Sequence, residues 1–143
     1  MGKRGRKIRI LLIEDDEVDV ESVRRSFMRH RIGNDIAVAG DGIAALEWLR
    51  GREQDFETRP LIILLDINMP RMNGLEFLRE LRTDPALRDL VVFVLTTSAD
   101  EKDIFAAYDL NVAGYMLKTE VGDGFTEAIR LIDHYWQVVE LRS

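Results

Sequence analysis

The chain alternates short apolar runs with longer segments in which apolar residues recur every three or four positions. The short runs are typical of strands that are buried on both faces of a sheet. The longer segments are typical of helices with one apolar face. Strands are predicted at 8–13, 35–39, 61–65, 90–95 and 114–117. A helix is predicted after each strand, and the last helix, which carries Phe125 and Trp136, is expected to be long.

Polar residues mark where these elements begin and end. Asp16 and Asn73 stand directly before helical segments. A short side-chain oxygen in that position can accept hydrogen bonds from the free backbone amides of the first turn, so both residues are predicted helix caps. Pro70 follows the third apolar run and cannot continue a strand ladder, because it has no backbone N–H. In the fourth helix, Ile104 and Phe105 are expected to be the main apolar anchors.

The regular alternation of strand and helix predicts a parallel sheet. Parallel neighbours need a right-handed crossover, usually a helix, so helices should cover both faces. We therefore expect an α/β fold of the flavodoxin-like, doubly wound type, with a five-stranded parallel sheet in strand order 2-1-3-4-5. At 143 residues the chain should form one domain at 8–143 with an extended C-terminal helix, preceded by a basic flexible tail at 1–7.

Composition narrows the class of protein. No apolar run approaches the ~20 residues of a membrane span, and no signal peptide is recognised, so a cytoplasmic protein without membrane contact is expected. The chain has no cysteine, which excludes disulfides, thiolate metal sites and cysteine nucleophiles. The formal net charge of −6 includes four positive charges from residues 1–7, which leaves −10 on the rest. This excess of negative charge disfavours nucleic acid as a partner, because it repels the phosphate backbone.

Charged and hydroxyl residues follow four of the predicted strands, at the ends that a parallel sheet brings to one edge. Ligands bind at this edge in open α/β sheets. Taken singly, these residues have ordinary explanations as helix-start acids, turn hydroxyls or a surface lysine. Together they fit the transfer of a phosphoryl group. They are Glu14, Asp15 and Asp16 after the first strand, Asp66 after the third, Thr96 and Thr97 after the fourth, and Lys118 after the fifth.

Each residue type in this group has a distinct use. Clustered carboxylates repel one another, and a hard divalent cation with oxygen ligands relieves the repulsion. Mg²⁺ suits a few carboxylates with water and a phosphoryl oxygen, whereas Zn²⁺ prefers histidine or cysteine. An ionised Asp66 is a competent oxygen nucleophile toward phosphorus and would form an acyl phosphate. The Lys118 ammonium and the Thr96 hydroxyl supply the charge and the donor that the transferred group needs.

These residues resemble the receiver domain of bacterial two-component response regulators, the family of the single-domain chemotaxis regulator. The resemblance extends from Ile8 to about Tyr135. It implies that Asp66 accepts phosphate from the phosphohistidine of a sensor histidine kinase, and that the protein is a signalling protein and not an enzyme. It also implies a Mg²⁺ site made of the metal ligands Asp15, Asp66 and the carbonyl of Asn68, with Glu14 acting through water.

The same resemblance assigns roles to three further residues. Thr96 and Lys118 would contact the phosphoryl group, and Tyr115 matches the aromatic switch residue that turns inward when Thr96 is drawn toward the phosphate. The alternative for Tyr115 is an ordinary half-buried strand tyrosine. Most receivers have proline after the active-site lysine, often in a cis bond, where this chain has Thr119. A cis bond without proline costs about 2.5–4 kcal/mol, so either that strain is retained or Lys118 is aimed differently.

Several segments resemble more closely the small regulators paired with bacterial and cyanobacterial phytochromes, which makes a phytochrome a candidate for the kinase. These segments are 68–74, 95–98, 108–110 and the last helix. The signal is expected to leave through a face made of the fourth helix, the fifth strand and the last helix. That face would bind a downstream protein or form a homodimer. It carries Phe105, Tyr108, Tyr115 and Trp136.

Three other functions could use similar residues. A haloacid-dehalogenase-type phosphatase also combines a strand-end aspartate with Mg²⁺, a hydroxyl and a lysine, but it needs a second aspartate two residues on, where this chain has Asn68. A flavin-binding module shares the sheet order, but Glu14 and Asp15 stand where a phosphate cradle needs amides and glycines. A degenerate receiver that is never phosphorylated is disfavoured, because every expected site residue is present.

Overall fold

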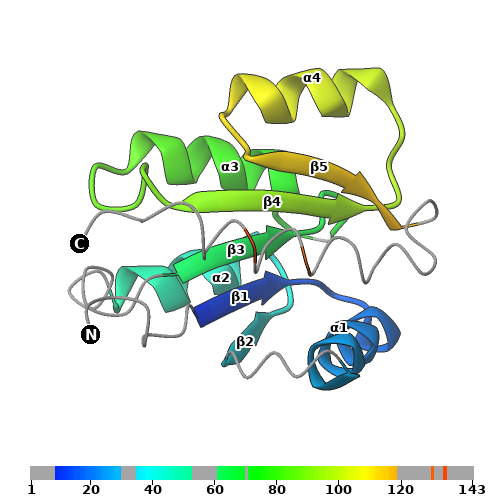
Figure 1. Cartoon of the computed structure of the whole chain (residues 1–143). Coiled ribbons are helices and arrows are strands. Elements are labelled where there is room, and N and C mark those ends of the chain that lie inside the picture. Colours follow the sequence, from blue (N-terminus) through cyan, green and yellow to red (C-terminus); the bar gives the residue numbers. More distant parts are fainter. Residues whose placement is uncertain are drawn as a thin grey trace.

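The computed structural model describes residues 9–29, 35–52, 61–69, 71–118, 130 and 134. Five strands form one sheet in the order β2-β1-β3-β4-β5, and every neighbouring pair is parallel (Figure 1). Both the flavodoxin-like class and the strand order predicted from the sequence are confirmed. The strands are β1 (Arg9–Ile13), β2 (Ile36–Ala39), β3 (Leu61–Leu65), β4 (Val91–Thr96) and β5 (Gly114–Leu117).

Polar side chains cap the helices between these strands. The Asp16 carboxylate accepts a hydrogen bond from the Val18 amide at 2.8 Å, and Asn73 exchanges reciprocal hydrogen bonds with Glu76. Both predicted caps are therefore confirmed, since each satisfies an amide that the first helical turn leaves free. The helices are α1 (Glu17–Arg29), α2 (Gly42–Arg50), α3 (Gly74–Thr83) and α4 (Glu101–Asp109).

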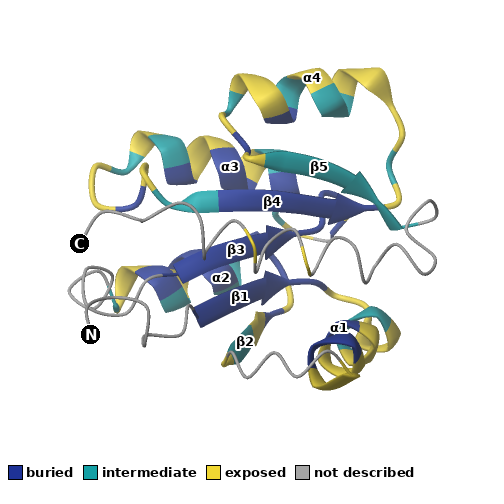
Figure 2. Ribbon diagram, viewed as in Figure 1, coloured by how far each residue is buried: buried dark blue, intermediate teal, exposed yellow. Residues whose placement is uncertain are grey.

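The sheet separates two apolar clusters, because successive side chains of a strand point to opposite faces. On one face, alternate residues of the central strands pack with Val23 and Phe27 of α1. On the other face, the intervening residues pack with α2, α3 and α4. Figure 2 shows β1 and β3 buried along their whole length. Burial on both faces fixes the register of these strands. The register in turn fixes which residues lie at the carboxyl edge of the sheet, where the strands end.

The packing of α4 differs from the prediction. Phe105 is 68% exposed, Ile104 is partly buried, and the buried residue of α4 is Ala107. The expectation that Phe105 anchors this helix is wrong. Residues three apart share one face of a helix, so the partly buried Ile104 lies on the same face as Ala107, while Phe105 is rotated away from it. A small buried residue lets α4 approach closely and leaves the phenyl ring in solvent.

Some expectations fall outside the described residues. These are the basic tail at 1–7, the long terminal helix with Phe125 and Trp136, and the peptide bond between Lys118 and Thr119. The domain limits at 8–143 therefore stay a prediction. Within the part of the chain that is described, every helix is too short or too polar to cross a bilayer.

Candidate functional site

Parallel pairing places two buried carboxylates side by side at the carboxyl edge of the sheet. Ile13 of β1 pairs with Leu65 of β3, and the amide of Asp66 donates to the Ile13 carbonyl at 3.0 Å. Glu14 and Asp66 directly follow these two paired residues, so they lie next to each other at the same edge of the sheet. Their exposed fractions are only 4% and 5%. Two acids this close and this buried need a compensating positive charge.

Asp15 completes a group that could hold a metal ion. Glu14, Asp15 and Asp66 each offer a carboxylate oxygen, and these oxygens lie within 4.8 Å of one another. Asp15 is exposed, so one side of the group is open to water. An oxygen-only donor set with an open side suits Mg²⁺ or Mn²⁺, which keep several water ligands, better than Zn²⁺.

The turn after β3 brings Asn68 to the same place. Its backbone amide donates to Oδ1 of Asp66 at 3.1 Å, so the turn folds back over the carboxylate. The Asn68 residue itself is exposed. Its carbonyl as a fourth metal ligand stays a prediction.

Thr96 and Lys118 contact Asp66 from the neighbouring strands. The buried hydroxyl of Thr96, the last residue of β4, donates to Oδ1 of Asp66 at 2.7 Å. The ammonium of Lys118, directly after β5, donates to Oδ2 of Asp66 at 3.3 Å and also to Glu14. The structure therefore brings together the predicted group of Glu14, Asp15, Asp66, Thr96 and Lys118, from four different strand ends.

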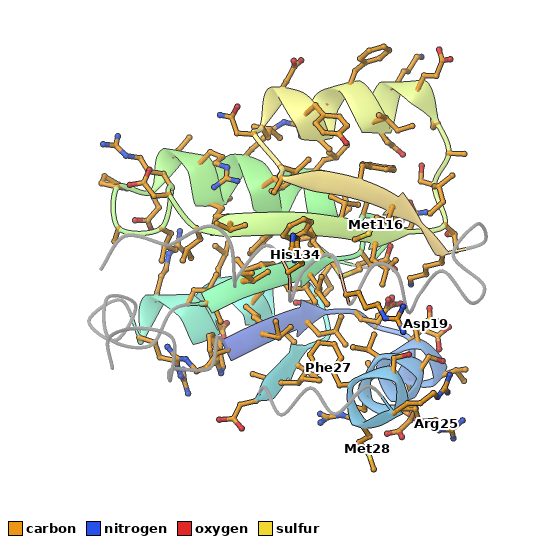
Figure 3. All side chains as sticks on the ribbon, in the orientation of Figure 1. Asp19, Arg25, Phe27, Met28, Met116 and His134 are labelled. Atoms are coloured by element: carbon orange, nitrogen blue, oxygen red, sulfur yellow. The ribbon has the colours of Figure 1, made fainter. Side chains whose placement is uncertain are left out.

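Asp19 also contacts Lys118, and reasoning from the sequence missed it. Its carboxylate, in the first turn of α1, accepts a hydrogen bond from Nζ of Lys118 at 2.7 Å. Figure 3 labels Asp19 at the end of α1 that follows β1. Acids are common in the first turn of any helix, because the helix dipole favours them there, so the sequence pattern does not mark Asp19 as special.

The electrostatics of the site follow from burial and from these contacts. Burial raises the pKa of Glu14 to about 7, with a further rise from the charge of Asp66 and an opposing effect of the hydrogen bond from Lys118. Burial alone would lower the pKa of Lys118, but hydrogen bonds to Asp19 and Glu14 more than offset it, so this pKa lies above its usual value. Lys118 is therefore a permanent cation at the site.

Tyr115 is connected to the loop that follows Thr96. Its hydroxyl donates to the backbone carbonyl of Ser98 at 2.8 Å, and its ring packs partly against the core. The Ser98 side chain donates in turn to the carboxylate of Asp103 on α4. Burial raises the pKa of the Tyr115 hydroxyl, so it is a donor at neutral pH. The half-buried placement fits both interpretations of Tyr115, and its role as a switch stays a prediction.

The turn after β3 is held by contacts that the sequence pattern did not indicate. Arg71, in a left-handed conformation with φ 62°, donates to Asp41 at 2.6 Å and lowers the pKa of that carboxyl. The amide of Gly42 donates to the Met72 carbonyl at 3.3 Å. These contacts fix the turn after β3 against the start of α2, beside the residues that surround Asp66.

We expect replacement of Asp15 by Asn to weaken Mg²⁺ binding by at least about tenfold, because a neutral amide replaces a ligand carboxylate. The measurement is the Mg²⁺ concentration needed to raise the thermal midpoint by a fixed amount, since a ligand stabilises the fold that binds it and does so in proportion to the logarithm of the ratio of its concentration to Kd. Asp16→Asn is the matched control. Asp16 lies outside the acidic group and caps α1, a task that Asn performs equally well. Equal weakening in both variants would contradict the metal site.

Comparisons with known proteins found a matching family model and similar solved structures. Residues 10–130 match the family model described as the response regulator receiver domain. The response regulator Rcp1 of Synechocystis sp. is 34% identical over 128 residues, which cover 89% of this chain and 87% of that protein. The crystal structure of Rcp1 in its Mn²⁺-bound form has 32% identity and a TM-score of 0.78, covering 95% of this chain and 99% of that one.

Two further solved structures are similar over almost the whole chain. The phosphorylated cyanobacterial phytochrome response regulator RcpA has 32% identity and a TM-score of 0.78, covering 92% of this chain and 95% of that one. The response regulator RPA3017, described in red light signalling of R. palustris, has 34% identity and a TM-score of 0.79, covering 95% of this chain and 99% of that one.

Proposed function

Because this chain belongs to the response regulator receiver domain family, we propose that Asp66 accepts a phosphoryl group from the phosphohistidine of a sensor histidine kinase. One observation carries the proposal. The buried Asp66 carboxylate receives hydrogen bonds from both Thr96 and Lys118, and it is also part of the acidic group that could hold a metal ion. Phosphoryl transfer requires a nucleophile, a hydroxyl donor, a cation and metal ligands.

In the proposed reaction an oxygen of Asp66 attacks phosphorus. A new bond forms between that oxygen and phosphorus while the bond from phosphorus to the histidine nitrogen breaks, and its electron pair stays on the imidazole. Lys118 and Thr96 donate hydrogen bonds to the phosphoryl oxygens, where negative charge is concentrated. When bound at Asp15, Asp66, the Asn68 carbonyl and, through water, Glu14, Mg²⁺ supplies further positive charge to these oxygens.

We propose that the signal leaves through α4 and β5. The Thr96 hydroxyl, at the end of β4, is hydrogen-bonded to Asp66, and the Tyr115 hydroxyl is hydrogen-bonded to Ser98 in the loop that follows. A phosphoryl group that accepts the hydrogen bond of Thr96 would shift this loop from one conformation to another, and Tyr115 would move with the loop. On α4, Phe105 and Tyr108 are 68% and 48% exposed, a surface suited to a partner protein or to a homodimer.

The similar proteins support a proposal about the stimulus. RcpA is described as a phytochrome response regulator and RPA3017 as acting in red light signalling, so we propose a phytochrome as the kinase. We also propose that the protein acts in the cytoplasm, without nucleic acid or membrane. An exposed Asn68 in place of a general acid argues against a haloacid-dehalogenase-type phosphatase, so we propose a signalling protein and not an enzyme.

The test is incubation with acetyl phosphate and Mg²⁺, followed by intact mass. We expect the protein to gain the mass of one phosphoryl group, which hydroxylamine removes and a metal chelator prevents. Asp66→Asn should gain nothing, because the amide that replaces the carboxylate is a poor nucleophile. Asp109→Asn, at the exposed end of α4, should behave as the unaltered protein. An adduct of equal yield in Asp66→Asn would refute the proposal.

A further inference from the structure

We infer that Asp19 is a positioning residue for Lys118, which it holds toward α1 until a phosphoryl group on Asp66 draws the ammonium away. The contact between them joins the first turn of α1 to the residue after β5. Asp19 lies outside the acidic group of Glu14, Asp15 and Asp66. This inference rests on the proposed function, since it describes how the same site is controlled.

The hydrogen-bonding capacity of Lys118 is already used. An ammonium group has three N–H donors, and Lys118 donates to three carboxylates, those of Glu14, Asp19 and Asp66. The Lys118 side chain is only 14% exposed, so water cannot easily replace a lost partner. A phosphoryl oxygen can therefore gain a hydrogen bond from Lys118 only if one of these carboxylates gives up its own.

Burial decides which carboxylate is released. The Glu14 side chain is 3% exposed, so separating it from Lys118 would leave a buried carboxyl group without its partner. The Asp19 side chain is 35% exposed, and water can solvate it after it is released. A cavity of about 310 Å³, lined by Glu14, Asp19, Lys118 and several residues of α1, gives its carboxylate room to move.

The distances define the position of the Lys118 ammonium between α1 and the acceptor. Nζ of Lys118 is 2.7 Å from Asp19 and 3.3 Å from Asp66. The shorter contact is the stronger one between charged groups, so Lys118 lies closer to α1 than to the acceptor. Asp19 therefore competes with the incoming phosphoryl group for the cation that stabilises it.

Asp19→Asn should release Lys118 from this competition. The variant keeps the shape of the side chain and removes its charge, so its amide oxygen holds the ammonium more weakly and competes less with the phosphoryl oxygens. We expect phosphorylation by acetyl phosphate, at saturating Mg²⁺ and low donor concentration, to be about three- to tenfold faster than in the unaltered protein. The half-saturating donor concentration should fall by a similar factor. Asp19→Glu, which restores the charge, should return both values toward those of the unaltered protein.

Two controls separate this effect from a general change in charge. Glu17→Gln removes an exposed acid from the same helical turn and should leave the rate unchanged. In a Lys118→Met background, Asp19→Asn should give no acceleration, because its effect passes through Lys118. Acceleration that persists in that background, or that Glu17→Gln reproduces, overturns the inference.

The remaining outcomes are also decisive. If Asp19→Asn is as slow as the unaltered protein, or slower, Asp19 does not compete for Lys118 and the inference fails while the proposed function stands. If the unaltered protein itself forms no adduct, the proposed function fails, and the inference fails with it. Asp19→Ser also removes the charge, so it should match Asp19→Asn and guards against an effect of the amide.

Discussion

Replacement of Lys118 by Met is expected to slow phosphorylation of Asp66 by about 100- to 1,000-fold at saturating Mg²⁺, the usual cost of removing one charge-stabilising donor. Met keeps the length of the side chain and removes the ammonium that now lies 3.3 Å from the Asp66 carboxylate. The measurement is the rate of appearance of the phosphorylated species by intact mass, with acetyl phosphate as the donor.

Lys102→Met is the matched control for this prediction. Lys102 is an exposed lysine in the first turn of α4, on a different element from the site residues. Its replacement changes the net charge by the same amount and should leave the rate unchanged. Thermal midpoints of both variants show whether the fold is retained. If the two variants lose rate equally, Lys118 has no special part in the reaction.

Replacement of Gly74 by Ala is expected to destabilise the protein by about 1–3 kcal/mol, the range seen when a well-packed interior receives an extra group. A Cβ on Gly74 would lie 2.6 Å from the Cα of Ile67 and 2.7 Å from the carbonyl oxygen of Asp66. Both are backbone atoms, which cannot rotate out of the way as a side chain can. The start of α3 or the end of β3 must therefore move, and Asp66 moves with it.

Urea denaturation measures this loss of stability, with Gly40→Ala as the control. A Cβ on Gly40 would meet no atom within 4 Å, so its replacement should change the free energy of unfolding by no more than about 0.5 kcal/mol. Gly74→Ala should also weaken Mg²⁺ binding, because the turn beside Asp66 shifts. Equal free energies of unfolding for the two variants would contradict the close approach at Gly74.

The sheet was predictable because its three central strands are buried at almost every position. Continuous apolar runs such as Leu61–Leu65 are typical of such strands, and they proved to be β1, β3 and β4 within one or two residues. The candidate site followed from the same pattern. Once the strands are parallel, the residues directly after them must share one edge, which brought Asp66 and Lys118 together although 52 positions separate them in the chain.

What the sequence did not reveal depends on short-range geometry. Asp19 is an ordinary acid in the first turn of a helix until β5 places Lys118 beside it. The need for glycine at position 74 arises from the path of the turn after β3, which no residue pattern encodes. The prediction for Phe105 was wrong because α4 has a narrow buried face, and this large apolar side chain lies outside that face.

The most direct test of the account is to identify the residue that carries the phosphate. Borohydride reduces an aspartyl phosphate to homoserine, which peptide mapping by mass spectrometry locates in the chain. After treatment with acetyl phosphate and Mg²⁺, we expect homoserine at position 66 and at no other aspartate. Homoserine at position 15 or 19 in its place, or its absence from a protein that binds Mg²⁺, would contradict the claim that Asp66 is the phosphoryl acceptor.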